Sequence, residues 1–181
     1  MIILPTIKTV PAKYHGPQRS KGGIKWIVLH TAESSEMGTS AEAVANYFAS
    51  GKVKASAHYD VDSDSIVRGV QDSVVAWAAP GANAQGLQIE MAGRAAQTAK
   101  EWADPYSLAE LELAAKLVGW LCIAHHIPVM WRRGHDLTLG LAGITTHVEV
   151  NNAFHQSTHT DPGPNFPASW FIHRVQTLVT G

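Results

Sequence analysis

The chain has 181 residues, the length of one domain. Hydrophobic residues make up 45% and charged residues 16%, and this composition excludes a disordered chain because enough apolar surface is available for a core. The formal net charge of -1 lacks the basic excess that nucleic acid or an anionic membrane surface attracts, so we expect neither as a partner.

Residues 1–23 predict an extended arm in front of one main domain, residues 24–181. Pro5, Pro11 and Pro17 disfavour a regular helix or strand in this arm. The arm lacks a basic start followed by an apolar stretch of about 7–15 residues, so we expect no secretory signal and synthesis in the cytoplasm. No apolar run approaches the ~20 residues of a membrane span, and we expect a monomer without membrane insertion.

The residues after the arm predict a central strand and then a helix. The run 24–29, IKWIVL, is apolar and rich in β-branched residues, as in a strand covered on both faces, and His30 follows at its end. Functional groups gather at that edge of an open α/β sheet. The run 39–42, TSAE, is a capping-box pattern, and it predicts a helix over residues 40–50 that stops at Gly51.

Residues 57–62 and 65–70 predict a hairpin with its turn between them. The aspartates of the run 60–64, DVDSD, have the spacing that begins a calcium-binding loop. Ser65 stands where that loop requires glycine, and Gln71 stands where it requires a glutamate. We therefore interpret the run as a solvated turn.

The middle of the chain predicts a second strand and the longest helix. The run 86–91, GLQIEM, indicates a strand that presents Glu90 near its end. A second capping box over 107–110 opens the helix, and Pro128 ends it. The predicted apolar face of this helix comprises Leu108, Leu111, Ala115, Val118 and Cys122. We expect the single cysteine to be a buried small hydrophobe rather than a nucleophile.

The last part of the chain predicts a loop over 134–143, a short strand over 144–146 and a final helix that begins near Pro167. Between them lies a stretch with His147, His159 and Asp161, followed at once by a Pro-Gly-Pro turn. His155, in the same stretch, is expected to lie at the rim of any site.

Two histidines and one aspartate offer a possible metal site. His30, His147 and Asp161 supply the three ligands that a catalytic zinc ion needs beside its water. They come from distant points of the chain, and no short motif links them. With ten histidines in the chain, ordinary surface or core histidines remain an equal alternative on the residues alone.

Five segments carry a resemblance to a known family: VLHT at 28–31, SAHY at 56–59, Asn83 followed by LQIE at 87–90, HVEV at 147–150 and TDPGP at 160–164. Together and in this order they resemble the zinc-dependent N-acetylmuramoyl-L-alanine amidases of the amidase-2 type. That family includes phage endolysins, bacterial muropeptide amidases and animal peptidoglycan recognition proteins. The resemblance implies a single α/β domain, with a central mixed sheet flanked by helices.

The resemblance also implies roles for individual residues. His30, His147 and Asp161 match the ligands of one zinc ion, and Glu90 matches the carboxylate that handles the proton of the attacking water. His159 stands where relatives often carry a lysine that stabilises the oxyanion. A histidine titrates near ~6.5 when unperturbed, so we expect this help to weaken above neutrality.

Four further residues are expected to contact substrate: Thr31, His58, Trp77 and Asn83. His58 has the alternative of a core histidine bound to a backbone carbonyl, and Trp77 and Asn83 could equally be scaffold. Besides His159, the sequence departs from the family pattern in two places, with Ala57 where several relatives carry tyrosine and Ala78 where many carry histidine. The first departure excludes a tyrosine-assisted mechanism and places more weight on Glu90.

The expected activity is hydrolysis of the amide between the lactyl group of N-acetylmuramic acid and L-alanine in peptidoglycan, by a zinc-activated water. A phage endolysin that acts on the bacterial cell wall is the expected setting. The alternatives are a bacterial muropeptide-recycling amidase, a non-catalytic peptidoglycan-binding module, and a zinc peptidase that cuts the stem peptide.

Overall fold

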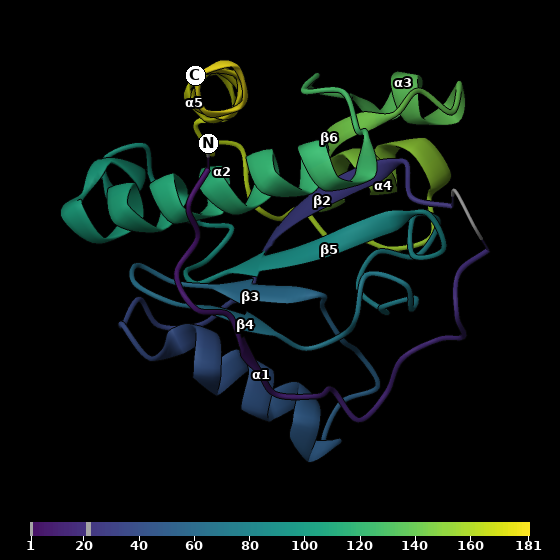
Figure 1. The fold of residues 1–181 in the computed structure, drawn as a ribbon, viewed down its shortest axis with the longest axis horizontal. Helices are drawn as coiled ribbons and strands as arrows, with labels where there is room; N and C mark the ends of the chain where they lie inside the picture. The colour runs from purple at the N-terminus through teal and green to yellow at the C-terminus, as the bar shows by residue number, and fades with distance from the viewer. Residues whose placement is uncertain (1, 21–22) are drawn as a thin grey trace.

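The computed structural model describes residues 2–20 and 23–181, so residues 1 and 21–22 of the expected arm lie outside the described residues (Figure 1). Within the described residues, six strands form one sheet in the order β1-β4-β3-β5-β2-β6. Their bounds are β1 Lys8–Thr9, β2 Trp26–Thr31, β3 Tyr59–Val61, β4 Ile66–Arg68, β5 Gly86–Met91 and β6 Gly143–Thr146. Only the β3–β4 pair is antiparallel, so the expected mixed sheet is confirmed.

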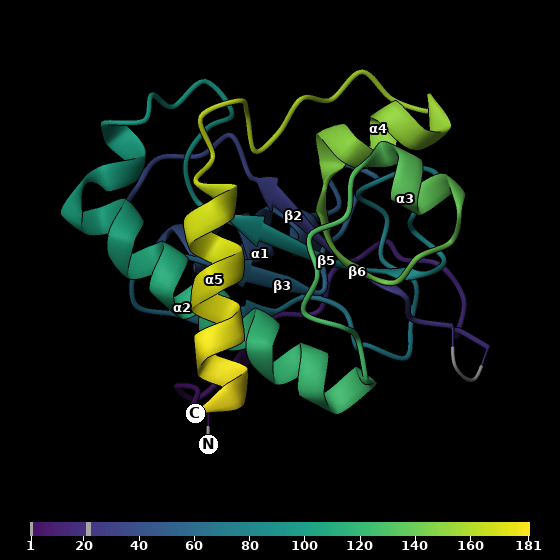
Figure 2. The ribbon, with the colours of Figure 1, turned by 90° about the horizontal axis from the view of Figure 1, so that it is seen from above.

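Helices cover both faces of this sheet, which confirms the single α/β domain. They are α1 Ser40–Ser50, the 3-10 turn η1 Glu101–Ala103, α2 Pro105–His125, α3 Gly134–Thr138, α4 His147–Phe154 and α5 Ala168–Thr180. Helix α2 crosses one face with α5 packed on its outer side, and α1 lies on the opposite face (Figures 1 and 2). No helix in the described ranges is both long and apolar enough to cross a membrane.

The two central strands, β2 and β5, are buried along their whole length. Successive side chains of a strand point to opposite faces. Ile27, Leu29 and Ile89 therefore pack in the main core, together with Leu117 and Leu121 of α2. The opposite face of the same strands carries polar side chains, among them His30. That histidine lies inside β2, whereas the sequence placed it after the strand.

The turn of the β3–β4 hairpin also holds the start of α1. Asp62 accepts hydrogen bonds from the backbone amides of Asp64 at 3.1 Å, Ser65 at 2.8 Å and Ala41 at 3.0 Å. The turn prediction is confirmed, but the expectation of a solvated turn is wrong for Asp62, which is fully buried. Thr39 is the N-cap residue of α1 as predicted, but its side chain makes no capping hydrogen bond, and Asp62 bonds the first turn instead.

Helix α2 begins earlier than the sequence indicates. Asp104 is its N-cap and accepts a hydrogen bond from the Ser107 amide at 2.8 Å, so the predicted capping box at 107–110 is wrong. Leu108 is 45% exposed, which corrects its place on the apolar face. Cys122 is buried as expected. The helix ends at His126, in a left-handed conformation, before Pro128.

Two short helices, α3 and α4, occupy segments that the sequence left without regular structure. Glu149 of α4 accepts a hydrogen bond from the Gly134 amide at 2.7 Å, so one helix binds the start of the other. Gly134 also lies against the backbone of α4, where a Cβ atom would be 3.2 Å from the Glu149 carbonyl oxygen. The two helices thus stabilise each other through contacts between residues distant in sequence.

The N-terminal segment is bound to the sheet at two points. Strand β1, a regular element that the expected arm did not include, pairs with β4 through Lys8 and Thr9. Further along, the Arg19 guanidinium donates hydrogen bonds to backbone carbonyls of Asp72, Ala84 and Gly86, at 2.9, 2.6 and 2.7 Å. This segment therefore closes one side of the loops that precede β5.

Candidate metal centre

The carboxyl ends of three parallel strands bring the predicted ligands to one place. His30 lies near the end of β2, and Glu90 is its register partner on β5. His147 follows directly after β6, whose last residue pairs with Leu29 of β2. Asp161 comes from the loop after α4, and its carbonyl accepts a hydrogen bond from the Val148 amide at 3.0 Å. The sheet therefore fixes the histidines, and this bond ties the aspartate loop to α4.

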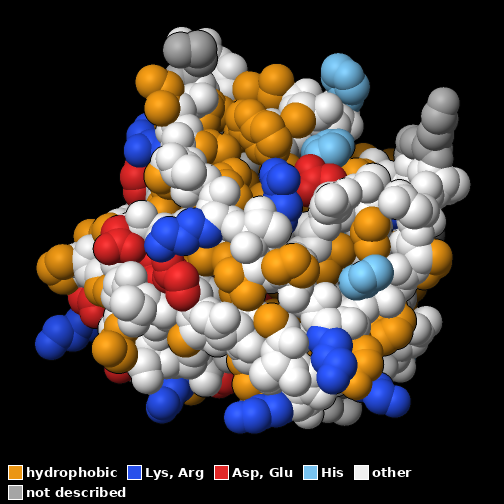
Figure 3. Space-filling model, turned by 60° about the horizontal axis from the view of Figure 1, so that its bottom comes forward, with side chains coloured by type: hydrophobic (Ala, Val, Ile, Leu, Met, Phe, Trp, Pro, Cys, Tyr) orange, Lys and Arg blue, Asp and Glu red, His pale blue; other side chains and the backbone are white. Residues whose placement is uncertain are grey.

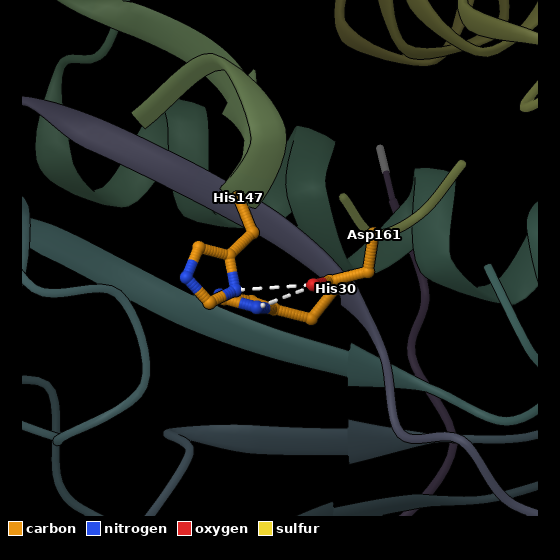
Figure 4. A group of neighbouring side chains, drawn as sticks. All are labelled: His30, His147 and Asp161. Atoms are coloured by element: carbon orange, nitrogen blue, oxygen red, sulfur yellow. Dashed lines mark hydrogen bonds and ion pairs between the residues drawn. The ribbon is translucent and has the colours of Figure 1, made fainter. Parts of the chain in front are cut away.

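The three predicted ligands face one another, as Figure 4 shows. His30 Nδ1 lies 3.0 Å from Asp161 Oδ2, and His147 Nδ1 lies 3.2 Å from Asp161 Oδ1. One ligand atom from each residue lies within 4.8 Å of the other two, and all three side chains are buried. Two imidazole nitrogens and a carboxylate oxygen form a donor set that could hold a metal ion.

A buried glutamine orients the first of these histidines. Gln88, on the same face of β5 as Glu90, places its side-chain oxygen 2.9 Å from His30 Nε2. Because an amide oxygen only accepts, His30 Nε2 carries the hydrogen and Nδ1 is left to bind a cation. The sequence analysis gave Gln88 no role, although strand alternation already placed it on the face of Glu90.

The charges in this cluster depend on each other. Burial opposes ionisation of Asp161, but its hydrogen bonds with His147 and His30 hold the pKa of Asp161 well below its usual range. Burial likewise lowers the pKa of His30, yet the charges of Glu90 and Asp161 raise it to about 9. The proton that His30 takes up sits on Nδ1, so a proton and a metal ion compete for the same atom.

Glu90 lies next to this donor set without belonging to it. Its Oε1 atom is 4.0 Å from His30 Nδ1, and its side chain is buried, which excludes an ordinary solvated strand residue. Burial raises the pKa of Glu90 to about 7, against the lowering effect of His30. A carboxyl group that titrates near neutrality is suited to accept and return a proton.

His159 lies at the mouth of the centre. Its side chain is 64% exposed, and its Nδ1 atom is 3.4 Å from Asp161 Oδ1. Its ring stacks on His147, with 4.4 Å between ring centroids and 12° between ring planes. A positive charge carried by the His159 ring would therefore lie beside the ligand cluster, which consists of His30, His147 and Asp161, and would remain accessible to solvent.

The centre opens into a cavity of about 780 Å³. One wall carries the cluster together with Thr31 and Glu33, and another is the apolar side of α1, with Val44, Tyr47 and Phe48. Figure 3 shows hydrophobic side chains next to histidine and acidic side chains on one face of the molecule. The sequence did not indicate the α1 wall, because an apolar helix face has the same pattern whether it lines a cavity or a core.

Of the four predicted substrate contacts, only Thr31 lines this cavity. His58 is fully buried, accepts a hydrogen bond from the Gln88 amide at 2.9 Å, and lies 3.0 Å from the Val74 carbonyl oxygen. Burial lowers the pKa of His58 to about 3, so this is the core histidine that the sequence left as an alternative.

Asn83 and Trp77 lie beside the cavity wall rather than in it. The Asn83 side chain accepts hydrogen bonds from the amides of Ala78 and Ala79, at 3.0 and 2.8 Å, and so closes its own loop. Trp77 is 38% exposed. His155 caps the end of α4 in a left-handed conformation, and it neither belongs to the group of predicted ligands nor lines the cavity.

The family model for N-acetylmuramoyl-L-alanine amidase matches residues 19–164. No curated protein matches the chain. The chain also resembles solved structures at 15, 17 and 21% sequence identity, and this likeness shows the fold alone.

Three solved structures illustrate this likeness. Hydrolase AmiA of Staphylococcus aureus, in complex with its ligand, has a TM-score of 0.75 at 15% identity, covering 98% of this chain and 84% of that chain. A mutant endolysin from Bacillus subtilis has a TM-score of 0.66 at 17% identity, covering 97% of this chain and 99% of that chain. An AmpD derivative has a TM-score of 0.64 at 21% identity, covering 98% of this chain and 96% of that chain.

Proposed function

The chain belongs to the N-acetylmuramoyl-L-alanine amidase family, and from this premise we propose that it hydrolyses the amide between the lactyl group of N-acetylmuramic acid and L-alanine in peptidoglycan. The observation that carries the proposal is the meeting of His30, His147, Asp161 and Glu90 at one end of a single cavity. A cavity of this kind, with a few converging polar groups, is the usual form of an enzyme's substrate site.

We propose zinc as the metal, one ion per chain. His30 and His147 would hold it through Nδ1, and Asp161 through its carboxylate, which leaves a position for water. The bond from His30 Nε2 to Gln88 supports this assignment, because it leaves Nδ1 free for the cation. Zinc bound there supplies a Lewis acid and lowers the pKa of water to ~7.

In this proposal Glu90 moves the proton. Its carboxylate accepts a proton from the attacking water as the oxygen bonds to the lactyl carbonyl carbon, and then donates it to the L-alanine nitrogen as the amide breaks. A pKa of about 7 lets the same group act as base and acid near neutrality. His159 as imidazolium would stabilise the negative oxygen of the carbonyl from the cavity mouth.

We further propose that the protein is a phage endolysin that lyses bacteria by attacking the cell wall. The likeness to an endolysin supports this setting, and the likeness to AmpD keeps a muropeptide-recycling amidase as the alternative. The two roles differ in substrate, so hydrolysis rates on intact cell walls and on soluble muropeptide fragments separate them. Faster cleavage of intact walls supports the endolysin.

Mass analysis of digested peptidoglycan tests the activity. We expect stem peptides with a free L-alanine amino group, their loss after treatment with a chelator, and their return when zinc is added back. Stems cut internally would instead indicate a peptidase. Binding to peptidoglycan without any release, by protein shown to contain zinc, would indicate a binding module and contradict the proposal.

A further inference from the structure

A second buried acid lies beside Glu90. Asp60 is the register partner of Glu90 across the parallel strands β3 and β5, which lie ~4.8 Å apart. Its strand neighbours Tyr59 and Val61 pack in the main core on the α2 side, so the Asp60 side chain points to the face that carries Glu90. Only 1% of Asp60 is exposed.

Neither carboxyl group is fully hydrogen-bonded. Among the described residues, both side-chain oxygens of Asp60 and the Oε2 atom of Glu90 are buried without a hydrogen-bond partner. On its other side Asp60 is in register with Val67 of β4, which packs against Ala41 and Ala45 of α1. This apolar side offers the carboxyl group neither a cation nor a donor.

These surroundings determine the protonation of Asp60. A buried carboxylate without a partner is costly, and a second negative charge beside it adds to the cost. Burial, reinforced by the charge of Glu90, holds the pKa of Asp60 well above its usual range. These surroundings favour the neutral form of Asp60, and a neutral carboxylic acid has one O–H group to donate.

We propose that Asp60 is a positioning residue that donates a hydrogen bond from its protonated carboxyl group to Oε2 of Glu90. This bond would hold the Glu90 carboxylate with Oε1 turned toward the ligand cluster, where it lies 4.0 Å from His30 Nδ1. A bond from a neutral acid to a carboxylate is among the stronger hydrogen bonds in proteins. The inference rests on the proposed role of Glu90 in amide hydrolysis.

Infrared spectroscopy tests the bond without any measurement of activity. At neutral pH the difference spectrum between wild type and Asp60→Asn should contain the carbonyl band of a neutral carboxylic acid. In a Glu90→Gln background the same band should shift, because its hydrogen-bond acceptor has changed. No such band, or a band that stays in place, would overturn the proposal even if the amidase activity were established.

Kinetics of the zinc-loaded protein test the positioning. Asp60→Asn keeps an N–H donor and should retain a kcat close to wild type. Asp60→Val removes the donor, and misplacement of Glu90 should lower kcat by about 10–100-fold at unchanged KM and zinc content. Equal losses in both variants, or no loss in either, would contradict the role.

A matched control separates positioning from general damage to this face. Val67→Ala truncates a buried neighbour of Asp60 on the next strand and should lower the unfolding temperature while keeping kcat. Asp60→Val removes the donor to a buried oxygen of Glu90, so it should lower the unfolding temperature as well. Its kcat should fall, whereas the kcat of Val67→Ala should not. If the wild type released no stem peptides, the proposed function would fail, and the infrared measurement would still decide on the bond.

Discussion

The two faces of the central sheet are built from the same strands and have different roles. Leu29 and His30 are neighbours in β2 and both are buried, but Leu29 packs under α2 and His30 points to the ligand cluster. The face under α2 gains stability from apolar burial. The other face buries Gln88, Glu90 and Asp60, and so bears the cost of removing polar groups from water. Leu29 and His30 thus divide core packing and the polar cluster between neighbouring residues of one strand, although Trp26 and Val28 on the His30 face pack in a second apolar cluster.

The largest effect is expected from Glu90, the proposed catalytic carboxyl group on the polar face. Glu90→Gln keeps the shape of the side chain but cannot take up a proton, so kcat should fall by about 10²–10⁴-fold. Zinc content and unfolding temperature should stay near wild type, since Glu90 is not in the donor set. Stem release by zinc-loaded variant and wild type is compared under the same conditions. Full activity with zinc bound would refute the proposed mechanism.

A substitution on the apolar face should show the reverse pattern. Leu29→Ala leaves a cavity in the main core and should lower the free energy of unfolding by about 2–5 kcal/mol. Its zinc stoichiometry should be unchanged, because its side chain points away from the cluster. Urea unfolding of the metal-free proteins measures the first effect and elemental analysis the second. His30→Ala is the matched control, and it should lose zinc; loss of zinc by Leu29→Ala as well would break the division between the faces.

An intermediate effect is expected where the polar face orients a ligand. Gln88→Ala removes the acceptor that fixes the His30 ring, and zinc affinity should weaken by about 10–100-fold. Competition with a coloured chelator measures this change. Thr145→Val is the control, because that hydroxyl is buried on β6 but bonds the Arg132 carbonyl at 2.9 Å. Equal weakening in both variants would show that any polar loss on this face disturbs the metal.

The smallest effect is expected at Glu110, a buried acidic residue on the otherwise apolar α2 side of the sheet. Glu110 of α2 is buried, and burial raises its pKa to about 9, with the Ala92 backbone opposing the rise and the nearby charge of Glu36 adding to it. The folded protein therefore holds this proton more tightly than the unfolded chain does. This contribution to stability is complete below the unfolded pKa and is lost as the pH rises toward 9.

Replacement of this acid should therefore stabilise the protein at neutral pH. Glu110→Gln cannot ionise in the unfolded chain, so its free energy of unfolding at pH 7 should exceed that of wild type by about 1–2 kcal/mol. Urea unfolding at several pH values should show the advantage growing between pH 5 and pH 8. A constant difference across that range would indicate that the proton on Glu110 is not the cause.

The sequence predicted the parts of this structure that depend on local pattern. The apolar run before His30, the alternation that ends at Glu90 and the helix stop at Gly51 are properties of neighbouring residues, and the structure has the corresponding elements. The residues alone left the proposed ligands as one of two equal alternatives, and the resemblance decided between them, because no local pattern joins His30 to Asp161, which lie 131 residues apart.

What the sequence missed depends on contacts between distant residues. Asp62 bonds the start of α1 from 21 positions away, so no capping pattern could reveal it. Helices α3 and α4 are too short for a periodic signal, and Glu149 joins them only after folding. The interaction of Gln88 with His30 needed the register of β2 and β5, which the sequence does not contain.

Through Arg19, the N-terminal segment contacts the residues that orient the proposed ligand His30. The Arg19 guanidinium lies 2.8 Å from His58 Nε2, and His58 in turn accepts the amide hydrogen of Gln88, whose side chain orients His30. A shortened protein that began at β2 would keep every proposed ligand but would lose Arg19, the first residue in this series of contacts. Any shortened or fused form of this amidase should therefore keep Arg19, with the junction placed upstream of β1.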